Sequence, residues 1–152
     1  MNDRQIKWDK RFLELAKYIA TQWSKDPSTK CGSVIVEDIN KIVTTGYNGF
    51  PIGVTDDESQ YADRAIKYKK VVHAEANAIL RAERSLKGCT VYVWPLPPCP
   101  ECTKLMIQKR IARVVFPHYW NDSSIQDRWV EDYQYSKSML LEAGVEIIQY
   151  YM

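Results

Sequence analysis

The chain has no long hydrophobic run and almost no excess charge of either sign. None of its 152 residues lies in a stretch near the roughly 20 apolar residues that a transmembrane helix needs. The first five residues are polar, which predicts no signal peptide. Twenty-one basic and 19 acidic residues give a net charge of +2, too small to predict a nucleic-acid partner. We therefore expect a cytoplasmic protein with neither a membrane nor a nucleic acid as its partner.

Cysteine and histidine are also scarce, with four and two residues. Four cysteines could form two disulfides, but a Cys-x-x-Cys pair with a histidine elsewhere favours metal binding in an intracellular chain. Internal repeats, low-complexity segments and linkers are absent. A length of 152 residues and 45% hydrophobic residues predict a single domain over 1–152 with a substantial core.

The few metal-binding side chains fall into one pattern. The sequence H-A-E begins at His73, and P-C-P-E-C contains Cys99 and Cys102. One imidazole and two thiolates leave the fourth position of a tetrahedral zinc ion open for water, which is typical of a catalytic site. Glu75, two residues after the histidine, can move protons without being a ligand. The combination H-x-E and P-C-x-x-C is typical of zinc deaminases that act on nucleobases.

Simpler interpretations of these residues exist. The cysteines could be a redox pair or part of a structural zinc site, for which Cys31, Cys89 or His118 would supply a fourth ligand. Glu75 could be only a first-turn acid that the helix dipole favours. Neither a redox pair nor a structural site accounts for the histidine, acid, prolines and cysteines together, so the pattern favours the catalytic site.

Hydrophobic periodicity and turn residues predict alternating strands and helices. Such alternation indicates an α/β fold with helices on both faces of a mixed sheet. His73 then begins one helix, and Cys99 and Cys102 begin the next, so that two helix starts converge on one metal. The basic cluster at Lys67, Lys69 and Lys70 is interpreted as a solvated helix face. The predicted helices cover 4–25, 61–70, 74–83, 100–110 and 124–143, the strands 34–36, 42–45, 90–94, 114–116 and 145–150, and a loop 46–59.

Most of the chain resembles deoxycytidylate (dCMP) deaminases, within the zinc-dependent cytidine deaminase superfamily. The zinc motifs alone indicate the superfamily, and G-Y-N-G-x-P before H-A-E-x-N-A-I indicates the dCMP branch. The matching stretches are S-K-D-P-S-T at 24–29, G-Y-N-G-F-P at 46–51, Asp56-Asp57, H-A-E-A-N-A-I at 73–79 and P-C-P-E-C at 98–102.

The resemblance implies a fold, a reaction and its control. The fold would be a three-layer α/β/α cytidine-deaminase-like fold with about five strands. The reaction would convert dCMP to dUMP and ammonia, supplying dUMP for thymidylate synthesis. The resemblance also implies activation by dCTP and inhibition by dTTP, with Mg²⁺ on the regulatory triphosphate. A homo-oligomer is expected, as a hexamer, and the five tryptophans and ten tyrosines suit buried interfaces.

Substrate contacts follow from the same resemblance. It implies that the Asn48 side chain binds the sugar and that the backbone of Ala74 meets the pyrimidine carbonyl. Tyr119 would stack on the base, with Trp120 as the alternative one residue later, although both could be aromatic surface or an oligomer contact. Ser24, Lys25 and Thr29 could line the 5′-phosphate pocket, and Lys25 could equally be a helix-end lysine.

The regulatory nucleotide is expected at a glycine-rich loop. The matching residues are Gly46, Tyr47, Asn48 and Gly49, where backbone N–H groups could approach phosphate or base edges. Asn-Gly is also an ordinary turn pair. Arg84 matches a position that is linked to regulation in some relatives, and it could equally be a solvated residue.

One departure from some viral relatives concerns a second zinc. Residues 51–72 contain neither cysteine nor histidine, so we expect one zinc per chain. Two other classes of function remain open. One is a deaminase of the same fold that acts on cytidine, guanine or tRNA adenosine, although a tRNA enzyme should carry a stronger basic face. The other is a zinc-stabilised nucleotide sensor without turnover.

Overall fold

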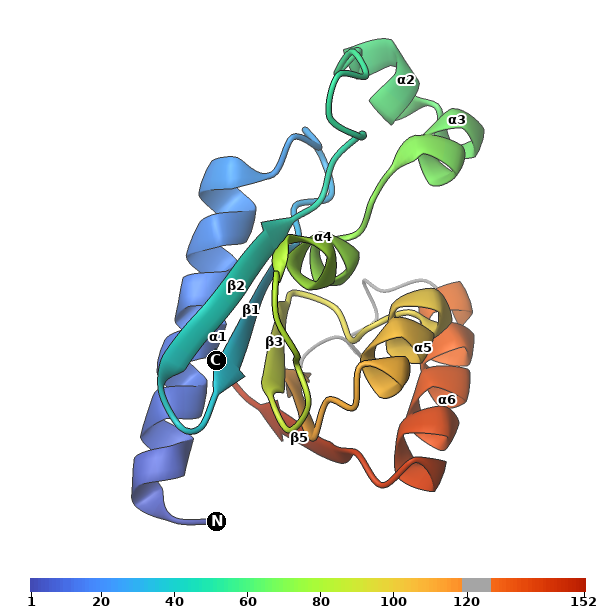
Figure 1. The fold of residues 1–152 in the computed structure, drawn as a ribbon. Helices are drawn as coiled ribbons and strands as arrows, with labels where there is room; N and C mark the ends of the chain where they lie inside the picture. The colour runs from blue at the N-terminus through green and yellow to red at the C-terminus, as the bar shows by residue number, and fades with distance from the viewer. Residues whose placement is uncertain (119–126) are drawn as a thin grey trace.

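The computed structural model describes residues 1–118 and 127–152 and arranges them around a five-stranded sheet (Figure 1). The order across the sheet is β2-β1-β3-β4-β5. β1 runs antiparallel to both β2 and β3, whereas β3, β4 and β5 are parallel. The sheet is therefore mixed, as predicted. The strands are β1 (Gly32–Glu37), β2 (Lys41–Tyr47), β3 (Thr90–Trp94), β4 (Arg113–Pro117) and β5 (Glu146–Tyr150).

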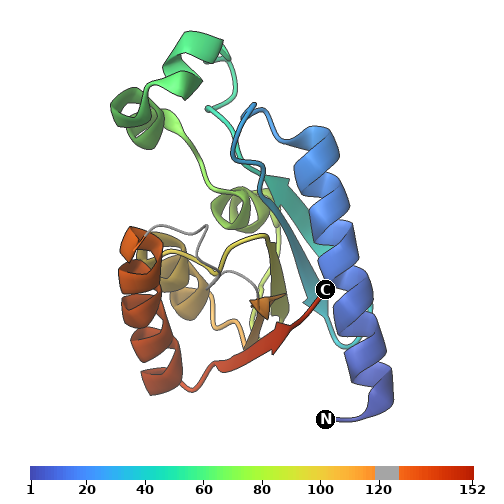
Figure 2. The same cartoon turned by 180° about the vertical axis from the view of Figure 1, so that it is seen from behind.

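Helices cover both faces of this sheet, which confirms the predicted layers. α1 lies along one face, and α4, α5 and α6 lie on the other (Figures 1 and 2). The small α2 and α3 project beyond the end of the sheet, next to the segment that follows α1. The helices are α1 (Asp3–Trp23), α2 (Glu58–Ala62), α3 (Arg64–Lys70), α4 (Ala74–Arg81), α5 (Pro100–Gln108) and α6 (Asp127–Glu142).

Alternation along the central strands builds a core on each face. Val34, Val36 and Tyr92 pack with the apolar stripe of α1. Ile35 and Val91 pack instead with the helices of the opposite face. Successive side chains of a strand point to opposite faces, so the almost wholly apolar β1 and β3 fit a sheet that is covered on both sides.

Two glycines allow helices to approach the sheet closely. A Cβ atom at Gly32 would lie 2.1 Å from the carbonyl oxygen of Ala16 in α1. A Cβ atom at Gly46 would lie 2.2 Å from the carbonyl oxygen of Ala74 in α4. Real Cβ atoms do not approach so closely, so any side chain at Gly46 would push α4 away from β2.

The prediction was wrong in the segment between β2 and α4. Gly46 and Tyr47 were predicted in a loop but belong to β2, and the predicted loop ends at α2 rather than at residue 59. The single predicted helix over 61–70 is two helices. Asp57 caps α2 through the backbone N–H groups of Ser59 and Gln60. Asp63 ends α2 and caps α3, because an aspartate in extended conformation that accepts from the next turn starts a helix.

The other described boundaries match the prediction or move by at most two residues. α4 ends at Arg81 and α5 at Gln108, two residues before the predicted ends, and α1 also ends early, at Trp23. Residues 124–126, predicted as helix, lie outside the described residues. Within the described ranges, no helix combines the length and apolar character that crossing a bilayer would require.

Candidate active site

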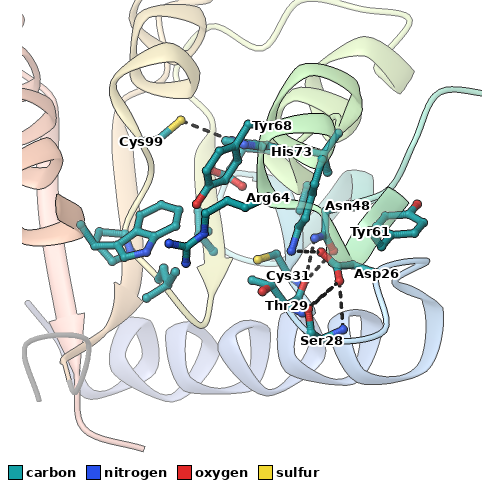
Figure 3. Close-up of a pocket in the computed structure, with 18 of the residues that line it drawn as sticks. Asp26, Ser28, Thr29, Cys31, Asn48, Tyr61, Arg64, Tyr68, His73 and Cys99 are labelled. Carbon is teal, nitrogen blue, oxygen red and sulfur yellow. Dashed lines mark hydrogen bonds and ion pairs between the residues drawn. The ribbon is translucent and has the colours of Figure 1, made fainter. Parts of the chain in front are cut away.

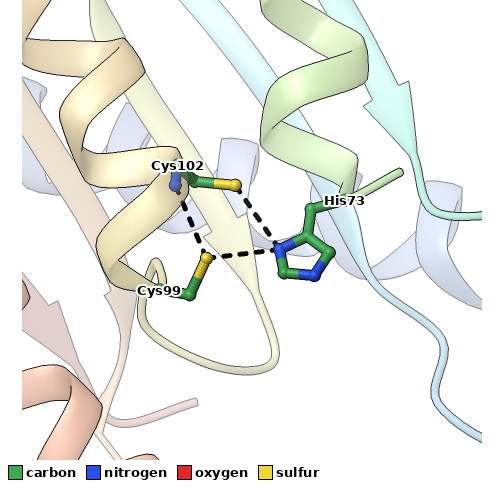
Figure 4. A group of neighbouring side chains, drawn as sticks. All are labelled: His73, Cys99 and Cys102. Atoms are coloured by element: carbon green, nitrogen blue, oxygen red, sulfur yellow. Dashed lines mark hydrogen bonds between the residues drawn. The ribbon is translucent and has the colours of Figure 1, made fainter. Parts of the chain in front are cut away.

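The histidine and the two cysteines meet where two helices begin. His73 is the N-cap of α4, and Cys99 is the N-cap of α5 with Pro100 as the first helical residue. Cys102 follows in the first turn, and its backbone N–H points at the Cys99 sulfur at 3.5 Å. The Nδ1 atom of His73 lies 3.3 Å from the Cys99 sulfur and 3.5 Å from the Cys102 sulfur (Figure 4).

These three side chains fit a zinc ion. Their ligand atoms all lie within 4.8 Å of one another, and no other such group of at least three ligating side chains occurs in the described part of the chain. Typical Zn–S and Zn–N bonds in a tetrahedron place sulfur and nitrogen about 3.5 Å apart, close to the observed separations. One nitrogen and two sulfurs also match the donor set of a three-ligand catalytic site.

The two sulfurs have different affinities for a proton. The Cys102 thiol and His73 hydrogen-bond to the Cys99 sulfur, which lowers the pKa of Cys99 to about 4 despite its burial. The hydrogen bond to Cys99, together with burial, raises the pKa of Cys102. The hydrogen bond with Cys99 also raises the pKa of His73 to about 9, against the effect of burial. Without a metal, these shifts favour a Cys99 thiolate beside a protonated His73 imidazole, and a metal cation would displace the protons of Cys102 and His73.

Glu75 lies in the first turn of α4 and is 5% exposed. Burial raises the pKa of its carboxyl, and the nearby charge of His73 opposes this shift. Glu75 is not part of the metal-ligating group, so its carboxylate is available for other chemistry. A carboxyl with a raised pKa both accepts and returns a proton readily near neutral pH, as general acid-base catalysis requires.

Of these groups, His73, Cys99 and Glu75 line a cavity of about 340 Å³, and Figure 3 shows the side chains around it. The cavity is built from the segment after α1, the end of β2, the helices α2 and α3, the start of α4, the loop after β3, and α6. Ala74, predicted to contact the pyrimidine, lies in its wall. A volume of this size suits a single small ligand such as a nucleotide.

Asn48 lines the cavity, and three hydrogen bonds fix its side-chain amide. Its Oδ1 accepts hydrogen bonds from the Ser24 hydroxyl and from the backbone N–H of Cys31. Its Nδ2 donates to the carbonyl oxygen of Thr29 at 2.7 Å. An amide nitrogen carries two hydrogens, so one donor of Asn48 is left for a ligand.

The comparisons with known proteins agree with this geometry. Residues 6–118 match the family described as the cytidine and deoxycytidylate deaminase zinc-binding region. The chain belongs to the cytidine and deoxycytidylate deaminase family.

Several relatives of this deaminase are similar over most of its length. An uncharacterized deaminase of Aliivibrio fischeri is 45% identical over 141 residues, which cover 93% of this chain and 92% of the relative. A deoxycytidylate deaminase of Mycobacterium phage D29 is 37% identical, with 72% and 94% covered. The deoxycytidylate deaminase of Homo sapiens is 42% identical over 75% of this chain, and this chain spans about two thirds (66%) of the human enzyme.

A solved structure supports the fold of the deaminase. The dCMP deaminase from the cyanophage S-TIM5, in apo form, superposes with a TM-score of 0.71 and 22% identity. The match covers 99% of this chain and 100% of the phage chain. The cytidine-deaminase-like architecture is thereby confirmed.

The residues predicted to contact phosphate divide into two groups. Thr29 lines the cavity, but Ser24 and Lys25 do not. The Ser24 hydroxyl donates to the amide oxygen of Asn48. The Lys25 ammonium donates to the carbonyl oxygen of Phe50 at 3.0 Å and lies 3.7 Å from the Asp56 carboxylate. Ser24 therefore orients a lining residue, while Lys25 ties the segment after α1 to the chain that precedes α2.

Two cations of the cavity were missed by sequence reasoning. Lys67 was interpreted as part of a solvated face, yet Lys67 and Arg64 both line the cavity. They lie three residues apart on α3, so they share one face of that helix. Their spacing was visible in the sequence, but only the fold shows that this face meets the cavity. Asp26, which pairs with Lys67 at 2.6 Å, and the aromatic residues Tyr68 and Trp129 were also missed.

The aromatic residues predicted to stack on the base are Tyr119 and Trp120. Both lie outside the described residues. His118, just before them, packs against Tyr151 with the two rings tilted and their centroids 4.4 Å apart.

The predicted regulatory residues do not form one continuous loop. Gly46 packs against α4, and Gly49 lies against the side chain of Lys25. The ring of Tyr47 contacts Trp23 and lies under the guanidinium of Arg81, 4.7 Å from it. Arg84 forms a two-pronged ion pair with Glu37, at 2.8 and 3.0 Å, and does not line the cavity.

Proposed function

We propose that this deaminase hydrolyses dCMP to dUMP and ammonia. One observation carries the proposal: two of the zinc ligands, His73 and Cys99, and the buried Glu75 line a cavity that also holds two cations, Arg64 and Lys67. The zinc ligands and Glu75 suit attack on an aminopyrimidine, and the two cations suit binding of a phosphate. The relatives named as deoxycytidylate deaminases support the same substrate.

Zinc would be held by His73, Cys99 and Cys102, one ion per chain. When bound, it supplies Lewis acidity that lowers the pKa of water from about 15.7 toward 7, so that hydroxide is available at neutral pH. The chain's own part is to present two thiolates and an imidazole from adjacent helix starts, where the positive end of each helix dipole stabilises negative sulfur.

Glu75 would move the protons of the reaction. Its carboxylate takes a proton from the attacking water while the oxygen adds to C4 of the cytosine ring. It delivers that proton to ring N3. It then carries the remaining proton of the added C4 hydroxyl to the amino group, so that the C4–N bond breaks with release of ammonia. A carbonyl remains at C4, and the carboxylate is regenerated.

The rest of the cavity would position the nucleotide. The remaining Nδ2 hydrogen of Asn48 would bind a sugar hydroxyl, and the backbone of Ala74 would meet the pyrimidine carbonyl. Arg64 and Lys67 would bind the 5′-phosphate beside Thr29, in place of the predicted Ser24 and Lys25. Base stacking by Tyr119 stays a prediction.

Regulation and assembly are further parts of the proposal. dCTP with Mg²⁺ would activate and dTTP with Mg²⁺ would inhibit, through Gly46 to Gly49 and Arg84, in a cytoplasmic homohexamer. The end of β2 supports a link between the regulatory residues and the active site. Tyr47 is adjacent to Asn48, and its carbonyl oxygen accepts a hydrogen bond from Asn77 of α4. A shift at the end of β2 would reach both the sugar contact and the helix that carries Glu75.

Parallel assays of ammonia release test the function. Zinc-loaded protein is given dCMP, CMP, deoxycytidine or dCTP, each with and without dCTP–Mg²⁺ or dTTP–Mg²⁺ as effector. We expect turnover of dCMP, raised by dCTP and lowered by dTTP. Turnover that ignores the triphosphates would refute the regulation alone. Absence of turnover with every pyrimidine would refute the substrate and direct the search to guanine and tRNA adenosine, or to a sensor without activity.

A further inference from the structure

Asp26 is the buried acid of the cavity wall opposite the metal group. The residue is fully buried and lies in the segment that joins α1 to β1. Its Oδ1 accepts from the backbone N–H groups of Ser28 and Thr29, at 2.9 and 3.1 Å, and from the Ser28 hydroxyl. Its Oδ2 lies 2.6 Å from the Lys67 ammonium. Burying a carboxylate costs free energy unless the carboxylate is paired in this way, so a buried Asp26 at this place indicates a role.

The pairing fixes the position of Lys67. A lysine side chain loses substantial rotamer freedom when its ammonium is fixed, and a surface lysine is otherwise mobile. Asp26 occupies one of the three donors of the ammonium, which leaves two for another anion. Lys67 is thus held at the cavity before any ligand arrives, with donors still to offer.

Asp26 is also linked to the sugar side of the cavity. Its backbone N–H donates to the Ser24 hydroxyl, which in turn donates to Asn48. Thr29, whose N–H binds the Asp26 carboxylate, accepts from Asn48 through its carbonyl oxygen. These hydrogen bonds therefore connect Asp26, Ser24, Asn48 and Thr29 in a ring. The ion pair with Asp26 joins Lys67 of α3 to this ring, in which Asp26 is the only charged acceptor.

We propose that Asp26 is a positioning residue that makes the cavity selective for a nucleoside 5′-monophosphate over the nucleoside, by holding Lys67 where the phosphate binds. This inference rests on the proposed deamination of dCMP. Hydrogen bonds from Lys67, Ser28 and Thr29 outweigh the effect of burial and keep the pKa of Asp26 below its usual value, so the ion pair persists at neutral pH.

The Asp26→Asn variant tests this role with little disturbance of the segment. An asparagine oxygen can still accept from Ser28 and Thr29, whereas its amide group cannot pair with an ammonium. We expect kcat/KM for dCMP to fall by about tenfold or more, mainly through KM, as is usual when a charge-assisted hydrogen bond is lost. We expect kcat/KM for deoxycytidine to stay within about twofold, because that substrate has no phosphate to bind.

Two further variants separate positioning from stability. Lys67→Met should cause at least the same loss of selectivity, because it removes the ammonium that binds the phosphate. Asp26→Asn in the Lys67→Met background should cause no further loss, because Asp26 acts through Lys67. The double variant also removes both buried charges, so it tests the inference even if Asp26→Asn alone folds poorly. Asp38→Asn is the matched control, since the Asp38–Lys41 pair is exposed at the β1–β2 turn.

The outcomes distinguish this inference from the proposed function. If the unaltered protein does not turn over dCMP, the proposed function fails and the inference fails with it. If it does, an equal loss for dCMP and deoxycytidine in Asp26→Asn would overturn the positioning role alone. Fully additive losses in the double variant, or an unchanged ratio of the two substrates, would overturn it as well.

Discussion

Glu75 and Glu101 are both first-turn helix acids within the zinc motifs, but their surroundings differ. Glu75 is buried beside His73 and the two cysteines, whereas Glu101 points outward and pairs with Lys104. Because only a buried carboxyl near the reacting atoms can relay protons, the two residues offer a matched pair for testing the proposed acid-base role.

We expect Glu75→Gln to lower kcat by about 10²- to 10⁴-fold, the usual contribution of general acid-base catalysis. The amide has the same shape but cannot take or return the proton. Zinc content by atomic spectroscopy and helical content by circular dichroism should match the unaltered protein. Glu101→Gln should keep activity within about twofold. Activity of Glu75→Gln near that of the Glu101→Gln control would rule out this role.

At the residue scale, the sequence alone predicted the functional residues that belong to short motifs. His73, Glu75, Cys99 and Cys102 form two short motifs, and the structure brings the three ligands together as predicted. Lys67 and Asp26 lie 41 positions apart in the chain, on separate elements. No local pattern in a single sequence shows that two such residues pair, so this contact, and the cavity that it shapes, could not be predicted.

Among the elements, α1 is joined to the sheet by a buried ion-pair network as well as by its apolar stripe. Asp9 of α1 is fully buried and accepts from Arg113 of β4, at 2.9 and 3.2 Å. It also accepts from the hydroxyls of Tyr92 in β3 and Tyr150 in β5. One carboxylate thus connects α1 with three strands, and these hydrogen bonds outweigh burial and lower the pKa of Asp9.

We expect Asp9→Asn to lower the free energy of unfolding at pH 7 by about 3–5 kcal/mol, because it removes the buried charge partner of the largely buried Arg113 guanidinium. Urea titration followed by tryptophan fluorescence measures this. The control is Glu146→Gln, which removes the exposed second partner of Arg113 and should cost no more than about 1 kcal/mol. Equal effects of the two changes would show that the network contributes no more than a surface pair.

The same network sets a pH dependence of known sign. The pKa of Asp9 is lower in the folded chain than its ordinary value of 3.8. Its contribution is therefore complete above that value and is lost as pH falls through the lowered folded pKa. The difference in unfolding free energy between the unaltered protein and Asp9→Asn should be constant from about pH 5 to 7, where Asp9 is ionised in both the folded and the unfolded chain. This difference should narrow as the pH falls below 3.8.

Element identity was more predictable from sequence than element boundaries. Every strand and long helix was anticipated, because the periodicity of apolar residues records which face is buried. The errors lie in 46–70, where the decisive features are capping side chains. Asp57 and Asp63 read as loop acids in the sequence but cap two helices. Gly46 reads as a loop glycine, but it is a strand residue that α4 approaches closely.

Over the whole molecule, the edge strand β2 and the two helices that contact it each carry an exposed apolar side chain. Ile42 of β2, Trp23 of α1 and Leu80 of α4 are about half exposed or more. The ring of Tyr47 joins these elements, since it contacts Trp23 on one side and Arg81 on the other. An edge strand with unpaired backbone groups and apolar neighbours is a surface that proteins commonly cover by association. The proposed homohexamer would cover it with further copies of the chain.

Leu80→Glu tests this assembly. Leu80 is 74% exposed, so a glutamate there should leave the fold of one chain intact but place a charge in the interface. Light scattering after size-exclusion chromatography should give about six times the 17.7 kDa chain mass for the unaltered protein and a smaller mass for the variant. Leu141→Glu is the matched control, because Leu141 is 59% exposed on α6, away from β2, and should keep the full mass. A Leu80→Glu variant of full mass, or equal dissociation by both changes, would show that subunits do not associate through the β2 edge.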